Sequence, residues 1–205
     1  MARARTIALW VLTIEVLVLA VTGVALYFLY RPEAAAAWTD TYGVGSALGR
    51  EVRVAHLAQD VHRWVAWLAL PTSIVAAVLL AVRARPTERV APGVATGLGL
   101  LVSVVAATVT GYLLPWDQLA LFAVTVGTNI SGYTWLRDGS VRFVLMGGTE
   151  IAPATVFKWL VLHAVVFGGA TAALVAMAWR RTRAGAGDAP ADQQDSPVVE
   201  APAGV

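Results

Sequence analysis

The chain contains no cysteine among its 205 residues. Without thiols it cannot form a disulfide, bind a cysteine-ligated iron–sulfur cluster or attach a c-type haem covalently. It is also poor in charge, because only 14% of its residues are charged, whereas a soluble domain carries about 25%. The formal net charge of +2 is small and does not indicate nucleic-acid binding.

Hydrophobic residues make up 58% of the chain and are gathered in four blocks. Each block can cross a hydrocarbon core of about 30 Å at about 1.5 Å per residue. Such segments must be helical, because lipid offers the backbone no hydrogen-bond partner. The first block is longer than a signal-peptide apolar region, so we expect it to be retained. The sequence thus predicts an all-α integral membrane domain, residues 1–183, with transmembrane helices over 7–30, 61–82, 95–114 and 157–179.

The positions of arginine and lysine predict the orientation in the membrane. The cations of one side are concentrated at helix ends and in the linker 83–94, where the positive-inside rule acts most strongly. We therefore expect a multi-pass plasma-membrane protein with both termini in the cytoplasm and with 31–60 and 115–156 outside. Residues 184–205 are rich in Ala, Pro, Gly, Asp and Gln and lack an apolar period, which predicts a disordered cytoplasmic tail.

The outer segment 115–156 has internal structure of its own. Pro115 ends the third helix by removing a backbone donor, and Trp116 then provides an aromatic anchor at the interface. Two apolar runs too short to span, 119–126 and 141–146, predict helices lying at the membrane surface, with an ordered loop as the alternative.

Two of the three histidines are predicted at matching depths. His62 opens the second helix at its outer end, and His163 lies a few residues into the fourth helix from the same side. Facing helices of a bundle build cofactor sites, and a polar imidazole inside a membrane is costly unless it is bonded. Two imidazoles give haem iron a six-coordinate site suited to electron transfer. The alternative is a pair of interhelical hydrogen bonds, and we expect His56 to be a surface residue.

Five segments, in order along the chain, resemble the N-terminal haem-binding part of cytochrome b, especially the short cytochrome b6 form. Together they touch all four predicted helices, over about residues 10–180. Lys158 stands where the family usually has arginine. The segments are TGVALYFLYRP at 22–32, HRW at 62–64, TGYLLPWDQ at 110–118, FAVTVGTN at 122–129 and TVFKWLVLH at 155–163.

The resemblance implies a four-transmembrane-helix haem-binding bundle of the cytochrome b N-terminal type. It implies His62 and His163 as the axial ligands of one non-covalent haem b. Gly23 and Gly111 would let the flat macrocycle lie against the first and third helices, with plain close helix packing as the alternative. Three cations are candidates to pair with the haem propionates, or are ordinary interfacial cations: Arg31, Arg63 and Lys158.

The chain departs from the family at the second haem. Family members carry a second histidine fourteen residues after each of the first pair, which is about four turns further and about 21 Å deeper. Here those positions hold Ala76 and Met177. Alanine cannot ligate iron, so only the outer haem is expected.

Three further residues are candidates for a quinone or proton site: Glu15, Trp116 and Asp117. Glu15 lies in the first helix, and an acidic group at the bilayer centre costs about 2.5–3.5 kcal/mol on insertion scales. We expect it to face the bundle or a partner, either as a hydrogen-bonded structural group or as a proton-relay or quinone contact. Pro71 is expected to kink the second helix.

These features predict an electron-transfer subunit that connects a quinol or quinone with a partner redox subunit of a respiratory or related complex. The family's C-terminal helices are missing from the chain, so we expect another subunit to supply or replace them. A cytochrome c or an iron–sulfur protein is a candidate partner, besides membrane lipid, and the chain alone is not expected to be a complete enzyme. The alternative is a non-catalytic structural or assembly subunit that retains the cytochrome b shape.

Overall fold

The computed structural model of the chain describes residues 1–42, 51–82, 90–126 and 152–187. Within these residues every regular element is helical, and four helices are long and apolar enough to cross a membrane. The prediction of an all-α bundle of four transmembrane helices is therefore confirmed. The apolar run 141–146 and residues 188–205 of the predicted tail lie outside the described residues.

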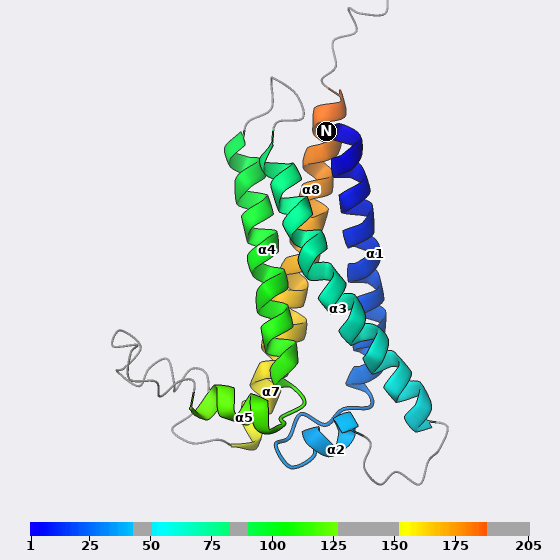
Figure 1. The fold of residues 1–205 in the computed structure, drawn as a ribbon, viewed down its shortest axis with the longest axis vertical. Coiled ribbons are helices and arrows are strands. Elements are labelled where there is room, and N and C mark those ends of the chain that lie inside the picture. The colour runs from blue at the N-terminus through cyan, green and yellow to red at the C-terminus, as the bar shows by residue number, and fades with distance from the viewer. Residues whose placement is uncertain (43–50, 83–89, 127–151, 188–205) are drawn as a thin grey trace, which may run out of the picture.

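The four spans run side by side (Figure 1). The fourth is a composite of two α-helices joined by a π-helical segment, which we call the π turn. The chain start and the end of α8 lie at one end of the bundle, the terminal end, and α2 and α5 lie at the other, the loop end. The elements are α1 (Ala2–Tyr27), α2 (Ala37–Tyr42), α3 (Glu51–Ala81), α4 (Val90–Leu113), α5 (Gln118–Thr125), α7 (Pro153–Val161), the π turn (Leu162–Phe167) and α8 (Gly168–Gly187).

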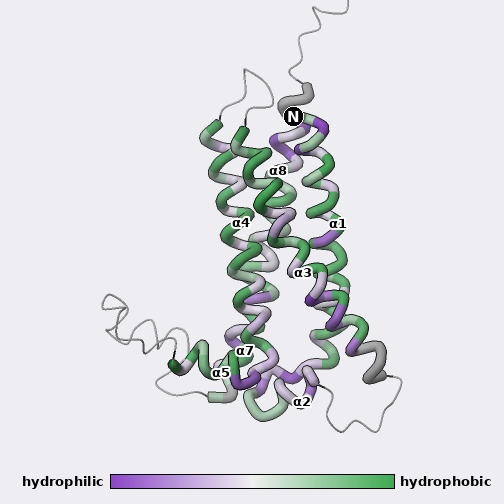
Figure 2. Tube along the Cα trace, viewed as in Figure 1, coloured by the Kyte–Doolittle hydropathy of each residue, from purple (hydrophilic) through white to green (hydrophobic). Residues whose placement is uncertain are grey.

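Helix ends differ from the predicted ones because hydropathy detects only the apolar part of a helix. α3 begins at Glu51, well before residue 61, since polar residues extend it beyond the apolar block. α8 continues to Gly187, past the predicted start of the tail at residue 184. Figure 2 shows hydrophobic residues along the spans and hydrophilic ones toward both ends of the bundle.

At the terminal end, the core is made by side chains of α1, α3, α4 and α8. Leu12, Ala76 and Leu100 are at most 1% exposed and pack in one cluster with Ala8 and Val175. Helices α3 and α4 approach through glycines: a Cβ on Gly97 would lie 2.8 Å from the carbonyl oxygen of Ala77, and one on Gly93 would overlap that of Leu80. Such contacts bring backbones together where side chains would hold them apart.

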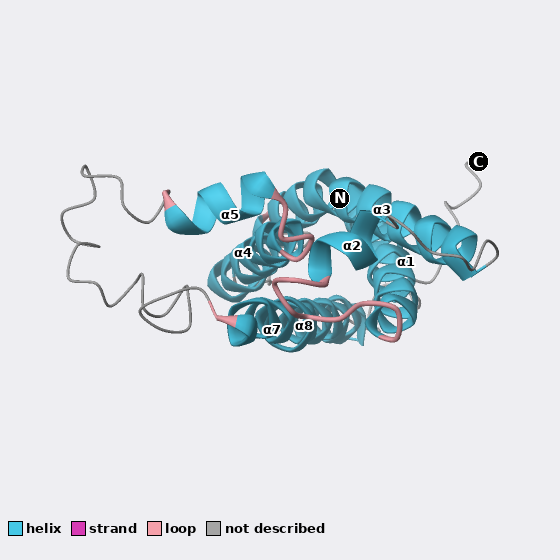
Figure 3. Cartoon of the chain, turned by 90° about the horizontal axis from the view of Figure 1, so that it is seen from below, coloured by secondary structure: helices cyan, strands magenta, loops and turns pink. Residues whose placement is uncertain are grey.

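At the loop end, short elements close the bundle. α2 lies across the helix ends, and its Ala37 packs with residues of α4, α5 and α7 (Figure 3). α5 occupies almost the residues predicted for an interfacial helix and is capped by Asp117, whose side chain accepts a hydrogen bond from Ala120 N–H. Trp116, predicted to be an aromatic anchor at the interface, is buried in this core.

Candidate functional site

The structure brings His62 and His163 together between the spans. Their ring centroids lie 6.0 Å apart, with an angle of 62° between the ring planes. His62 comes from α3 and His163 from the π turn of the fourth span. His56 is exposed.

Hydrogen bonds fix the tautomer of each ring. The Thr22 hydroxyl donates its single proton to the carbonyl of Val18, at 2.7 Å, so its oxygen accepts from His62 Nδ1, at 2.8 Å. His163 Nδ1 lies 2.8 Å from the carbonyl oxygen of Ala107, which can only accept. Both rings therefore carry their proton on Nδ1 and keep the lone pair of Nε2, which is the form that binds a metal.

The two predicted glycines lie directly against these rings. A Cβ on Gly23 would be 3.4 Å from His62 Cε1, an ordinary contact. A Cβ on Gly111 would be 2.7 Å from His163 Cε1 and 3.0 Å from its Nδ1. The His163 ring therefore fits against α4 in this position only because residue 111 has no side chain.

The three candidate cations differ in how they are held. Arg31 donates to both carboxylate oxygens of Asp40, at 3.0 and 2.7 Å, and this pairing lowers the pKa of the Asp40 carboxyl. Arg63 pairs with Asp60 at 2.7 Å, and both side chains are more than half exposed. Lys158 is half-buried in α7.

The turn after α4 is held by hydrogen bonds from two tyrosine side chains. Trp116 has a φ of 52°, in the left-handed region that non-glycine residues rarely adopt. Tyr30 donates to the carbonyl of Leu114, and Tyr42 donates to Asp117 at 3.0 Å. Burial raises the pKa of Tyr30. Both Asp117 oxygens are thus engaged, one by Tyr42 and one as the cap of α5.

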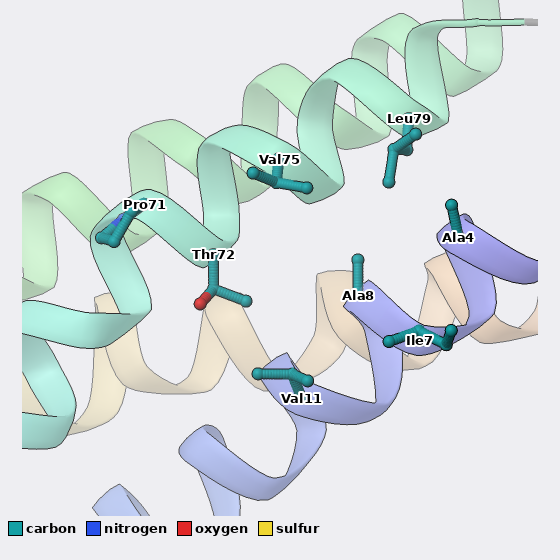
Figure 4. A pocket seen from close by; sticks show the side chains of 8 residues that line it. All are labelled: Ala4, Ile7, Ala8, Val11, Pro71, Thr72, Val75 and Leu79. Atoms are coloured by element: carbon teal, nitrogen blue, oxygen red, sulfur yellow. The ribbon is translucent and has the colours of Figure 1, made fainter. Parts of the chain in front are cut away.

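Glu15 faces α3 in the bundle. Thr72 lies 3.0 Å from its Oε1, while Oε2 is buried without a hydrogen-bond partner among the described residues. Thr72 also lines an open groove of about 450 Å³ between α1 and α3, whose lining residues are almost all apolar (Figure 4). Pro71 lies within α3, opposite α1 in that groove.

The positions of the family's second ligands hold no imidazole. Ala76 is 1% exposed in the core of the terminal end. Met177 is 43% exposed, whereas Ala178 is fully buried against Leu9 and Leu80. The residue of α8 that points into the bundle at this level is therefore Ala178, one later than the spacing of fourteen indicates.

Sequence reasoning did not identify Thr22 or the Ala107 carbonyl as partners of the histidines. Thr22 directly precedes Gly23, so a search for hydroxyls beside the candidate glycines would have found it. No residue pattern predicts which backbone carbonyl will bind a histidine, and none predicted the π turn.

Comparisons with known proteins agree with this geometry. The sequence model of the family described as cytochrome b/b6/petB matches residues 5–180. Cytochrome b6 of Gracilaria tenuistipitata var. liui is 30% identical over 159 residues, which cover 76% of this chain and 71% of that protein. Cytochrome b6 of Chlamydomonas reinhardtii is 30% identical over 164 residues, which cover 78% and 73%.

A solved structure, described as a hyperthermophilic respiratory complex III, contains a chain of similar fold. The TM-score is 0.69 at 20% identity, and the match covers 98% of this chain but 52% of that one. This chain therefore spans about half the length of the solved chain, and the likeness is one of fold. The sequence match over residues 5–180 and the identity with cytochrome b6 proteins establish that the chain belongs to the cytochrome b/b6 family.

Proposed function

We propose that the chain is an electron-transfer subunit of a membrane redox complex and holds one b-type haem between His62 and His163. The observation that carries this proposal is the pair of facing imidazoles, each with its Nδ1 proton committed and its Nε2 lone pair available. With 6.0 Å between their ring centroids, His62 and His163 are the residues that would hold the haem iron through their Nε2 atoms.

A haem with two histidine ligands supplies reversible one-electron transfer at its iron, without an open position for oxygen chemistry. The residues of the chain orient the ligands and accommodate the ring. Thr22 and the Ala107 carbonyl hold the imidazoles in the ligating tautomer, and Gly23 and Gly111 leave space on either side.

Among the cations, we propose Arg63 and Lys158 as the partners of the propionates. The Arg63–Asp60 pair is exposed, and such pairs are worth only about 0–1 kcal/mol, so a propionate can replace Asp60 at little cost. Arg31 is held by Asp40 through its guanidinium and its backbone N–H. We therefore assign Arg31 to the loop rather than to the cofactor.

We further propose that the site holds one haem and not two. The residue fourteen before Gly23 on α1, about four turns away on the same face, is Leu9. Leu9 is fully buried against Ala178, where the equivalent level near His62 has only a glycine. Ala76 offers no ligand, and Gly97 faces the α3 backbone at Ala77 instead of a ring. Packed side chains thus take the volume that a second macrocycle would require.

The proposed direction and partners follow from this arrangement. We place the loop end and its haem on the outer side of the plasma membrane and both termini in the cytoplasm, as the arginine distribution favours. The fold shared with a chain of a respiratory complex III supports the proposal that this chain acts together with other membrane redox subunits. Electron exchange then involves a quinol or quinone and a redox partner such as a cytochrome c or an iron–sulfur protein.

A pyridine haemochrome assay on the purified protein tests the proposal. We expect one haem b per chain, lost in His62→Ala and in His163→Ala but kept in His56→Ala, the exposed control. Two haems per chain, or an unchanged low-spin spectrum in His163→Ala, would exclude this site. A well-folded wild-type chain without haem would favour the structural or assembly subunit instead.

A further inference from the structure

The π turn in the fourth span interrupts an otherwise α-helical segment at the candidate ligand itself. His163 is its second residue, and it is closed by Gly168, whose N–H donates to the carbonyl of His163, five residues earlier. π-helical segments are rare, at well under 1% of residues, and as single turns they act as one extra residue inserted into an α-helix. The extra residue changes which side chains face the bundle beyond it.

The buried residues of α8 show the size of this change. Thr171, Val175 and Ala178 are 7%, 5% and 0% exposed and define its core face. In an uninterrupted α-helix, at about 100° per residue, these three would point about 80°, 120° and 60° away from His163. One extra residue removes about 100° of that rotation, so the three come back to within about 40° of the His163 direction.

The same rotation accounts for the exposure of Met177. Met177 would lie within about 40° of His163 in a plain α-helix, yet it is 43% exposed, with its Sδ reaching Thr96 of α4 at 3.8 Å. Toward the loop end, no correction is needed: Val156 and Trp159 are buried in α7 and lie about 20° and 40° from His163 by ordinary α spacing. The shift therefore begins at the π turn and affects only the terminal half.

The lack of a side chain at Gly168 relieves a close contact within this turn. A Cβ at this position would lie 3.2 Å from the His163 carbonyl oxygen, so that carbonyl must shift by a few tenths of an ångström to admit a side chain. A Cβ on the neighbouring Gly169 would meet no heavy atom of the described residues within 4 Å, beyond its own helical backbone and chain neighbours. Gly169→Ala is therefore a matched control for Gly168→Ala.

We infer that the π turn is a one-residue register adjuster, which puts His163 and the core face of α8 on the same side of the span, and that Gly168 is its positioning residue. The ring of His163 is held by α4 through Ala107 and Gly111, while Gly168 holds its backbone. Only the part of this inference that concerns haem ligation rests on the proposed function.

A disulfide measures the register without any cofactor. Thr171 donates to Ser103 of α4 at 3.0 Å in the buried core, and the chain has no cysteine of its own. The double variant Ser103→Cys/Thr171→Cys should therefore cross-link on oxidation in membranes, seen as protection from a maleimide reagent, while each single variant should not.

Deletions then test whether the π turn contains one residue more than an uninterrupted α-helix would need. Val165 and Val166 are 68% and 46% exposed, so their loss removes little packing. Deleting Val165 should convert the π turn to α-helix and keep the cross-link, whereas deleting both valines should turn α8 by about 100° and abolish it. Loss of the cross-link in the single deletion, or its survival in the double one, overturns the inference.

The role of Gly168 is read from the haem-loaded full chain. Gly168→Ala should shift the low-spin electron paramagnetic resonance signal, Gly169→Ala should leave it unchanged, and deletion of Val165 should restore the signal of Gly168→Ala, because residue 168 then makes an ordinary α-helical bond. Equal spectra in the two alanine variants would refute the positioning role. A wild-type chain without haem whose cross-links follow the predicted pattern would overturn the proposed function and leave the register intact.

Discussion

Gly111→Ala is the substitution whose effect follows most directly from the geometry of the site. The added methyl carbon would lie 2.7 Å from His163 Cε1, whereas non-bonded carbons rest at about 3.5–4.0 Å. The ring must therefore move by about 1 Å, and its bond to the Ala107 carbonyl, now 2.8 Å, must stretch. The variant thus perturbs the ligand without removing it.

The expected cost has three contributions. Overpacking costs about 1–3 kcal/mol, the weakened hydrogen bond about 0.5–1.5 kcal/mol, and the better helix propensity of alanine returns about 0.5–1 kcal/mol. A net loss of about 2 kcal/mol should lower the thermal unfolding midpoint by about 4–8 °C for a chain of this size. The haem should also be retained about 30-fold less tightly if the whole loss falls on ligand position.

A second glycine of α4 serves as the control for the same measurement. A Cβ on Gly99 would stand 3.5 Å from the flexible side chain of Leu174. Gly99→Ala should keep the wild-type midpoint and haem content in a thermal scan followed by absorbance. If Gly111→Ala behaves like Gly99→Ala, the close contact with His163 does not constrain the site and the reasoning fails.

Three further predictions concern carboxyl groups. Arg31 lowers the pKa of Asp40, so the stability contributed by this pair is present above the ordinary carboxyl pKa of 3.8 and is lost as the pH falls through the lower folded value. Asp40→Asn should therefore flatten the acid limb of a stability–pH profile. An unchanged limb would show that the pair contributes no stability. Asp117→Ala should lower the stability by about 1 kcal/mol, because the cap of α5 is lost. Asp117→Asn can still cap the helix and should keep wild-type stability. If Asp117→Asn instead slows quinol-linked turnover of the assembled complex at unchanged stability, Asp117 has a role in proton transfer. Glu15→Gln should keep the contact with Thr72 and full assembly, measured by yield and size-exclusion profile, and failure to assemble would show that the carboxylate itself is required.

The spans and the ligand pair were predictable because each depends on one strong physical rule. A long apolar block must be a membrane helix, and an imidazole placed in such a block must have a partner. His62 and His163 were therefore singled out by position, and the structure brings their rings together. The ligation and the haem count stay predictions.

The remaining features depend on contacts that a linear pattern does not encode. α2 is a six-residue helix next to the Arg31–Asp40 pair, and no periodicity marks it. The π turn lies in the uniformly apolar stretch LHAVVF, where an added residue changes no composition. For that reason spacing alone selected Met177 as the inward residue, although Ala178 occupies that place.

If the chain holds one haem as proposed, the glycine contacts between α3 and α4 make a second haem site difficult to build. Introducing histidines at Ala76 and Ala178 would add donor atoms but no volume, because Gly93 and Gly97 keep the backbones of α3 and α4 in contact and Leu9 of α1 packs against Leu80 and Ala178. The helices would have to separate and Leu9 would have to be replaced by a smaller residue before new ligands could hold a second macrocycle. Each ordinary improvement of this packing therefore moves the chain further from a two-haem site.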